Sequence, residues 1–357
     1  TQQRLTRYNA WMPHVHVDFH EQYYNEPYYF APAAEPMHDV VTPWQRTFQA
    51  TIGQRNARYF DAAGWLYFTR QQFDLLYPGY GDTWPTFNGA IGMTYEQGGH
   101  SRAGLAIETD EGDTLTLADR ILHHHTTGLA TVETTAQHAA QVVEEFERFF
   151  RNARTAPGRY RTFVVKAAAA PDVRAALAAY LDGQGIAYGY AVQARSARGF
   201  RYRAGDTGPV EVEPGDLVVG LDQPKAALAK VLFEPRTTLT DSLTYDITAW
   251  ALPYVYGLDA AALEEALPEA APAPPVALAP PLPEQPYAYL SGWQSVADLR
   301  FLADVLLAGV RLRYAVGPFE VEGRAYAPGT LILTRTGNEG MGDRFDTIVR
   351  AAAERHG

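Results

Sequence analysis

The chain contains no cysteine. No disulfide can therefore stabilise it, and any metal ion would be bound by histidine or carboxylate side chains. The chain also lacks an uninterrupted apolar run of the roughly 20 residues that a transmembrane helix needs, so we expect no membrane span. Basic residues are in the minority, with 30 Lys and Arg against 41 Asp and Glu and a net charge of -11. Nucleic acid is not an expected partner, because binding it requires a clustered basic surface.

The sequence does contain enough apolar material for more than one core. It has 357 residues, of which 46% are hydrophobic and 12% aromatic. Domains of ordinary size would divide a chain of this length into about two. Residues 1–155 are rich in aromatic residues and histidine, whereas residues 156–357 are rich in Ala, Leu, Val and Pro. We therefore expect one domain in each of these regions.

Hydrophobic spacing and breaker residues predict an α/β protein. In the first region, apolar residues recur at helical spacing across 118–153, which predicts one long amphipathic helix. In the second region, predicted strands alternate with helices, an order typical of a mainly parallel sheet. The strands are expected at 160–166, 187–192 and 216–220, and the helices at 171–183 and 224–232. The proline-rich stretch 268–286 is expected to be an extended spacer or surface loop.

The strongest local signal is the segment 13–21, PHVHVDFHE, which predicts a strand with one apolar face and one face of potential metal ligands. At the rise of a straight strand, His16 and His20 lie about 13 Å apart, too far to bind one metal ion together. His14 and His16 are only about 6.6 Å apart and could chelate jointly, as in an amidohydrolase-type His-x-His site. Polar residues at the end of a strand are the ordinary alternative.

A second candidate is Glu96, which ends an apolar segment that begins at Asn88 and precedes the glycine pair Gly98-Gly99. A carboxylate placed at the end of a strand can act as a general base. It can equally be a solvated strand end.

Together and in this order, the segments Val17-Asp-Phe-His-Glu21, Tyr80-Gly-Asp-Thr-Trp-Pro85 and Gly92-Met-Thr-Tyr-Glu96 resemble the second half of the carboxypeptidase A-like zinc peptidases, and most closely the large bacterial members. The resemblance covers residues 1–155. It implies that His20 is the third zinc ligand and that Glu96 activates the metal-bound water. It also implies that Tyr80, or alternatively Tyr77, contacts the carboxylate of a peptide substrate.

The sequence departs from this family in one large respect. The first two zinc ligands of the family form a His-x-x-Glu motif upstream of the third, and no His-x-x-Glu occurs among these 357 residues. The Asn-Arg pair that receives the substrate carboxylate would also lie before residue 1. We therefore expect a fragment of a longer zinc peptidase that is incomplete and inactive alone.

Residues 156–357 resemble the class I glutamine amidotransferase-like domain that follows the peptidase domain in some large bacterial relatives. The resemblance implies a flavodoxin-like α/β domain. Glutaminase chemistry in that family needs a cysteine nucleophile, and this chain has none, so the domain should be chemically silent. The run His123-His124-His125 is expected to be an exposed or capping cluster and not a metal site.

Three functions are therefore open. The first is a zinc-dependent carboxypeptidase that removes residues from peptide C-termini, which by family resemblance would work in the periplasm or outside the cell. The second is a binding or structural module derived from a degenerate peptidase. The third is a metal hydrolase that uses His14 and His16.

Overall fold

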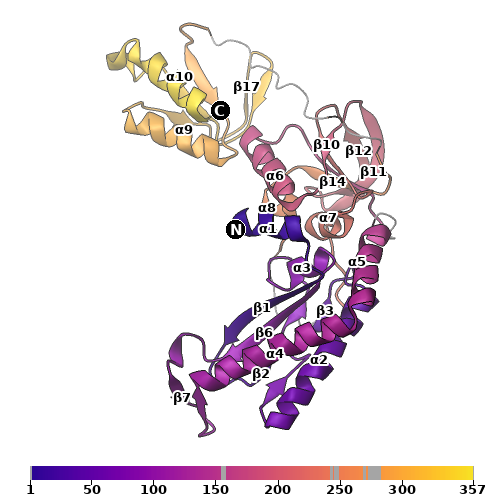
Figure 1. Cartoon of the computed structure of the whole chain (residues 1–357). Helices are drawn as coiled ribbons and strands as arrows, with labels where there is room; N and C mark the ends of the chain where they lie inside the picture. Colours follow the sequence, from indigo (N-terminus) through magenta and orange to yellow (C-terminus); the bar gives the residue numbers. More distant parts are fainter. Residues whose placement is uncertain are drawn as a thin grey trace. The chain divides into compact units, whose positions relative to one another are not determined.

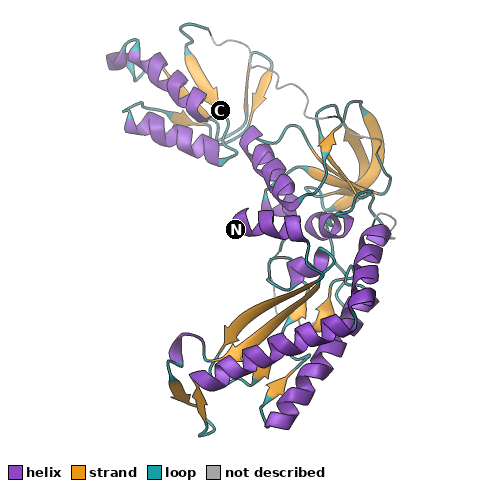
Figure 2. Ribbon diagram, in the orientation of Figure 1, coloured by secondary structure: helices purple, strands orange, loops and turns teal. Residues whose placement is uncertain are grey.

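The computed structural model describes residues 2–153, 158–241, 244, 249–267, 271 and 283–356. It is a mixed α/β protein, which confirms the expected fold class (Figures 1 and 2). The chain forms two compact units. The first comprises Thr1–Ala167 and Leu181–Ala273, and the second comprises Ala168–Tyr180 and Pro274–Gly357. The first unit thus extends beyond residue 155, where the composition of the sequence changes.

The N-terminal part of the first unit is built around a four-stranded mixed sheet of order β1-β6-β2-β4. Strand β1 runs parallel to β6, β2 runs antiparallel to β6, and β4 runs parallel to β2. Aromatic and aliphatic side chains, including Phe48, Phe60 and Tyr95, form the core that the sheet shares with helix α2. The elements of this part are α1 (Gln2–Trp11), β1 (Val15–Gln22), β2 (Tyr28–Tyr29), β3 (Ala34–Met37), α2 (Pro43–Ala63), β4 (Tyr67–Phe68), β5 (Asp74–Leu75), α3 (Thr83–Phe87), β6 (Ile91–Gly98), β7 (Ala106–Glu108), β8 (Thr114–Thr116), α4 (Leu117–Gln137) and α5 (Ala139–Ala153).

The single long helix expected at 118–153 is in fact two helices, α4 and α5, which are separated at His138. The Thr134 hydroxyl donates a hydrogen bond to the Ala130 carbonyl, and the His138 ring lies 2.9 Å from the Thr134 carbonyl oxygen. Side chains that bond the backbone one turn earlier compete with the helical ladder and bend helices. The prediction was wrong here because hydrophobic spacing continues through the break.

The second sheet of the first unit has six strands in the order β10-β13-β9-β14-β11-β12. Every neighbouring pair is antiparallel, so the expectation of a parallel, flavodoxin-like sheet is wrong for these strands. Strands β9 and β10, which flank helix α6, do run in the same direction, but β13 lies between them. The hairpin of β11 and β12 was not predicted. The elements are β9 (Thr162–Val165), β10 (Gly189–Tyr190), β11 (Arg195–Arg201), β12 (Asp206–Val212), β13 (Leu217–Gly220), α7 (Ala226–Phe233), α8 (Leu252–Val255) and β14 (Ala260–Leu263). Helix α6 (Pro171–Gln184) belongs to the second unit as far as Tyr180 and to the first unit from Leu181.

The second unit has a small antiparallel sheet of order β15-β19-β16 and a hairpin of β17 and β18. Phe301, Val305, Leu333, Phe345 and Val349 form its core between the sheet, α9 and α10. Most of the proline-rich stretch 268–286 lies outside the described residues. The elements are β15 (Ala288–Ser291), α9 (Val296–Leu307), β16 (Arg313–Tyr314), β17 (Phe319–Val321), β18 (Arg324–Tyr326), β19 (Leu331–Thr334) and α10 (Arg344–His356).

Among the helices in the described ranges, none combines the length and apolar composition that crossing a bilayer requires.

Candidate functional site

The two residues that the sequence singled out as catalytic candidates, His20 and Glu96, lie side by side. They face each other in the register of the parallel strands β1 and β6. The His20 Nδ1 atom is 3.1 Å from the Glu96 Oε2 atom, which is hydrogen-bonding distance. Two segments separated by 76 residues thus bring an imidazole and a carboxylate to the same end of one sheet.

The environments of the two side chains differ. The side chain of His20 is 61% exposed and that of Glu96 only 7%. Burial lowers the pKa of His20, but the adjacent Glu96 carboxylate outweighs this effect and the pKa is raised. Burial raises the pKa of Glu96, although His20 partly opposes the shift. The pair therefore combines an accessible imidazole with a buried carboxyl group that binds a proton more readily than usual.

Two further acids lie around this pair. Asp18 precedes His20 by two residues on β1, and its negative charge helps to raise the pKa of both His20 and Glu96. Asp82 is fully buried at the start of α3, and burial raises the pKa of its carboxyl group. Its side chain accepts a hydrogen bond from the Thr83 hydroxyl. The site is consequently acidic, with His20 as the cationic group.

The loop before α3 brings Tyr80 to the neighbourhood of β1. A Cβ atom at Gly81 would lie only 1.8 Å from the Asp18 Oδ2 atom, so the backbone of this loop packs directly on the side chain of Asp18. Tyr80 is 37% exposed, and its ring contacts that of Tyr77 edge-on at 5.2 Å. Both tyrosines that the sequence suggested for substrate contact thus lie on one loop, close to Asp18.

His14 and His16, the alternative metal ligands, have different neighbours. The His14 ring lies 4.2 Å from that of Phe146 on α5. The His16 ring lies 5.9 Å from that of Tyr8 on α1. The two imidazoles therefore pack against different helices.

The histidine run on α4 is more buried than expected. His123 is 8% exposed, and its Nδ1 atom lies 2.8 Å from the amide oxygen of Gln97. Burial lowers the pKa of His123 to about 4, so the ring is neutral near pH 7. His124 lies 2.8 Å from the Tyr28 hydroxyl, and His125 is exposed. The expectation of an exposed or capping cluster was wrong for His123 because one face of α4 packs on the core.

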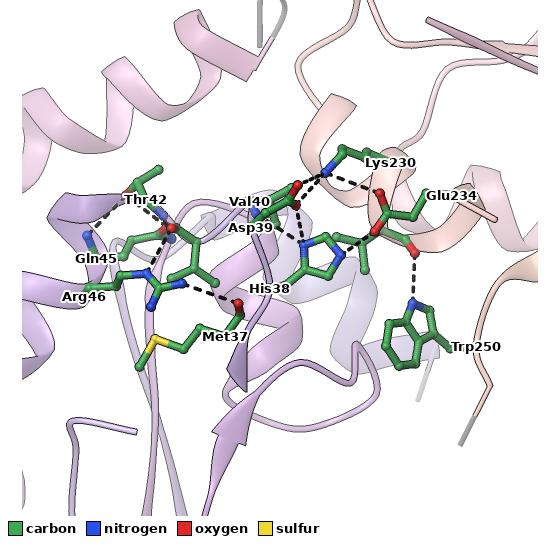
Figure 3. A network of polar contacts seen from close by, with 12 residues as sticks. Met37, His38, Asp39, Val40, Thr42, Gln45, Arg46, Lys230, Glu234 and Trp250 are labelled. Atoms are coloured by element: carbon green, nitrogen blue, oxygen red, sulfur yellow. Dashed lines mark hydrogen bonds and ion pairs between the residues drawn. The ribbon is translucent and has the colours of Figure 1, made fainter. Parts of the chain in front are cut away.

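A second titratable cluster was not predicted (Figure 3). His38 is fully buried, with its Nδ1 atom 3.0 Å from Asp39 and its Nε2 atom 2.7 Å from Glu234. Lys230 lies 2.6 Å from Asp39 and 3.3 Å from Glu234. Glu234 follows His38 by 196 residues, and no motif in the sequence connects them. A polar residue pair so distant along the chain leaves no signal in a single sequence.

His38, Asp39 and Glu234 could in principle hold a metal ion. In the described part of the chain, they are the only group of three histidine or acidic side chains whose potential ligand atoms all lie within 4.8 Å of one another. The geometry, however, is that of an ion-pair network. Both ring nitrogens of His38 face carboxylates, so the ring donates from both when it is protonated. The Val40 amide also points at Nδ1, at a longer distance of 3.3 Å, and a protonated Nδ1 cannot accept that bond. Lys230 supplies a second positive charge to the two carboxylates.

Comparison of the chain with protein families, with characterised proteins and with solved structures gives no match. Functional inference therefore depends on the sites themselves.

Proposed function

We propose that this chain supplies the His20 and Glu96 half of a zinc carboxypeptidase-like site that hydrolyses the C-terminal bond of peptides. One observation supports the proposal above the others. The two residues matched to the zinc ligand and the general base of that family are in hydrogen-bonding contact, at facing positions of neighbouring parallel strands.

Glu96 has the properties of a general base in this proposal. Burial raises the pKa of its carboxyl group, and a carboxylate with a raised pKa accepts a proton more readily. It would take a proton from the attacking water and deliver it to the leaving amine. His20 holds the proton-accepting oxygen in place through the bond from Nδ1. Tyr80, on the loop that packs on Asp18, would contact the substrate carboxylate.

The described residues do not form a complete catalytic zinc site around His20. Such a site has three protein ligands and an open position for water. Asp18 and Glu96 lie near His20, but these three do not bring their ligand atoms together as closely as the His38 cluster does. The proposal therefore requires further zinc ligands, a His-x-x-Glu motif that these 357 residues do not contain.

A binding module is the second candidate, and one observation favours it. Glu96 already occupies the hydrogen-bonding position at His20 Nδ1, so the pair is satisfied without a metal ion. In that case the aromatic loop of Tyr77 and Tyr80 would bind a peptide without turnover.

The experiment is an assay of the longest natural form of the protein with peptides that end in a free carboxylate, using the same peptides with an amidated C-terminus as a substrate control. Removing a general base typically slows turnover by about 10²- to 10⁴-fold, so Glu96→Gln should lower kcat to that extent. The matched control is Glu108→Gln, an exposed carboxylate on β7, which should leave kcat unchanged. Wild-type protein that binds these peptides but never cleaves them would favour the binding module instead.

A further inference from the structure

A cavity of about 520 Å³ lies between helix α1 and the start of β1. Its lining includes Arg4, Arg7, Tyr8, Trp11 and His16. His16 lies about 13 Å along β1 from His20, so this cavity is separate from the catalytic candidate. The cavity is notable for its charge, because it holds two arginines in a chain with a net charge of -11.

Two residues that line this cavity each carry a buried polar atom with no hydrogen-bond partner in the described part of the chain. The two atoms are the hydroxyl oxygen of Tyr8 and the Nδ1 atom of His16. Tyr8 is only 7% exposed, so its hydroxyl has lost water without gaining a protein partner. An unpaired buried polar group destabilises the folded state, and a ligand that bonds to it would recover that loss.

The two arginines are also without carboxylate partners among the described residues, and both are exposed. Arg4 acts electrostatically on both Tyr8 and His16, which places its positive charge near the two unpaired atoms. The cavity therefore presents cationic and neutral donors together.

Helix α1 is held in place by contacts with other elements of the first unit. The Tyr8 ring packs edge-on against Trp84 at 4.5 Å, and the Asn9 side chain donates a hydrogen bond to the Gly183 carbonyl. The Lys225 ammonium group lies 3.4 Å from the Asn9 amide oxygen. These contacts fix the positions of the cavity residues before any ligand binds, which reduces the entropy lost on binding.

We propose that the cavity lined by Arg4, Arg7, Tyr8 and His16 binds an oxyanion, the carboxylate or phosphate group of a small ligand. Guanidinium groups pair with planar or tetrahedral oxyanions through charge-assisted hydrogen bonds, and the Tyr8 hydroxyl donates a further bond. Trp11, which is 86% exposed, offers an apolar surface for the remainder of the ligand. This site does not depend on the peptidase proposal.

Isothermal titration of the full chain with inorganic phosphate and with benzoate, at constant ionic strength set with chloride, tests the proposal. Saturable binding of either anion is expected, and the tighter of the two identifies the oxyanion type. Arg4→Gln and Tyr8→Phe each remove one donor and should weaken binding by about ten-fold. Arg58→Gln, at an exposed arginine of α2, is the matched control and should bind as wild type does.

Two results would overturn the proposal. One is a wild-type chain that shows no saturation by either anion at concentrations up to about 20 mM, beyond the range of a weak specific site. The other is a Tyr8→Phe chain with unchanged melting temperature and unchanged affinity, since the buried hydroxyl is the donor that a nonspecific surface contact would not use.

Discussion

At the scale of single residues, His20 and His38 both contact carboxylates but in different surroundings. His20 is accessible and faces a single buried carboxylate, Glu96. His38 is fully buried between Asp39 and Glu234, and Lys230 completes the network. The first arrangement leaves the imidazole available for chemistry, whereas the second uses it to connect β3 and its following loop with α7.

The His38 network should contribute measurably to stability. His38→Leu removes a positive charge from the nearly buried Glu234, and breaking a buried charge pair typically costs about 3 to 5 kcal/mol. Lys230 remains beside Glu234, so we expect the lower end of that range. Urea unfolding measures the change, and His125→Leu at an exposed position of α4 is the control. A free energy of unfolding equal to that of wild type would show that the network is not stabilising.

The same variant has a defined pH dependence. Burial lowers the pKa of His38, but its bonds to Asp39 and Glu234 outweigh this and raise the pKa above 6.5. When folding raises the pKa of a histidine, protonation of that histidine stabilises the folded state. This stabilisation is complete below the pKa of the unfolded state and is lost as the pH rises through the pKa of the folded state. The stability difference between wild type and His38→Leu should therefore be largest near about pH 6 and shrink towards about pH 9. A difference that grows with pH would contradict the assignment of charge.

The His20 and Glu96 pair could be predicted from the sequence, because each residue ends a recognisable strand and the strands resemble a family in their order. His38 could not be found in this way, because it precedes its partner Glu234 by 196 residues and lies in no recognisable motif. The burial of His123 could not be predicted either, because the sequence does not show which face of α4 packs on the core.

At the scale of elements, the contact between β6 and α3 depends on a glycine. A Cβ atom at Gly92 would lie 1.9 Å from the Asp82 carbonyl oxygen and 2.4 Å from the Thr86 hydroxyl. This close approach places the buried Asp82, at the start of α3, against the strand that carries Glu96.

Gly92→Ala should therefore destabilise the protein by about 1 to 3 kcal/mol, the usual cost of overpacking a tightly packed core. Gly220→Ala is the control, because Gly220 also lies in a strand but has open space where its Cβ would lie. The control should be neutral or slightly stabilising, since alanine restricts the unfolded chain. The melting temperature of Gly92→Ala should be lower than that of Gly220→Ala, and equal melting temperatures would contradict the close packing of α3 on β6.

Helices α6 and α7 and the strands β9, β10 and β13 followed from the sequence, but the pairing of the strands did not. Strand and helix alternation at 160–232 is compatible with a parallel sheet, but β13 lies between β9 and β10 and pairs antiparallel with both. Strand β14, on the other side of β9, is antiparallel to it as well. Local periodicity contains no information on which strand becomes the neighbour of which. The break at His138 depends likewise on side-chain hydrogen bonds that periodicity does not show.

At the scale of the whole molecule, the chain forms two compact units, each with its own hydrophobic core. Units of this kind commonly unfold as separate cooperative transitions. Phe345→Ala, which removes a buried ring from the core of the second unit, should lower the midpoint temperature of one calorimetric transition and leave that of the other unchanged. Phe48→Ala in the first unit should do the reverse. If both variants shift one common transition, the units are not independent.

The proposed role of His20 as a zinc ligand that needs further ligands can be measured as the amount of zinc bound per chain. One imidazole without two further ligands does not form a catalytic zinc site, so this chain alone should hold much less than one zinc ion per molecule. The longest natural form, if it includes His-x-x-Glu, should hold one zinc ion and lose it in His20→Ala. One zinc ion per molecule in this chain alone would contradict the proposal that the site is incomplete. Zinc that stays bound in His20→Ala of the longer form would contradict the proposal that His20 is a ligand.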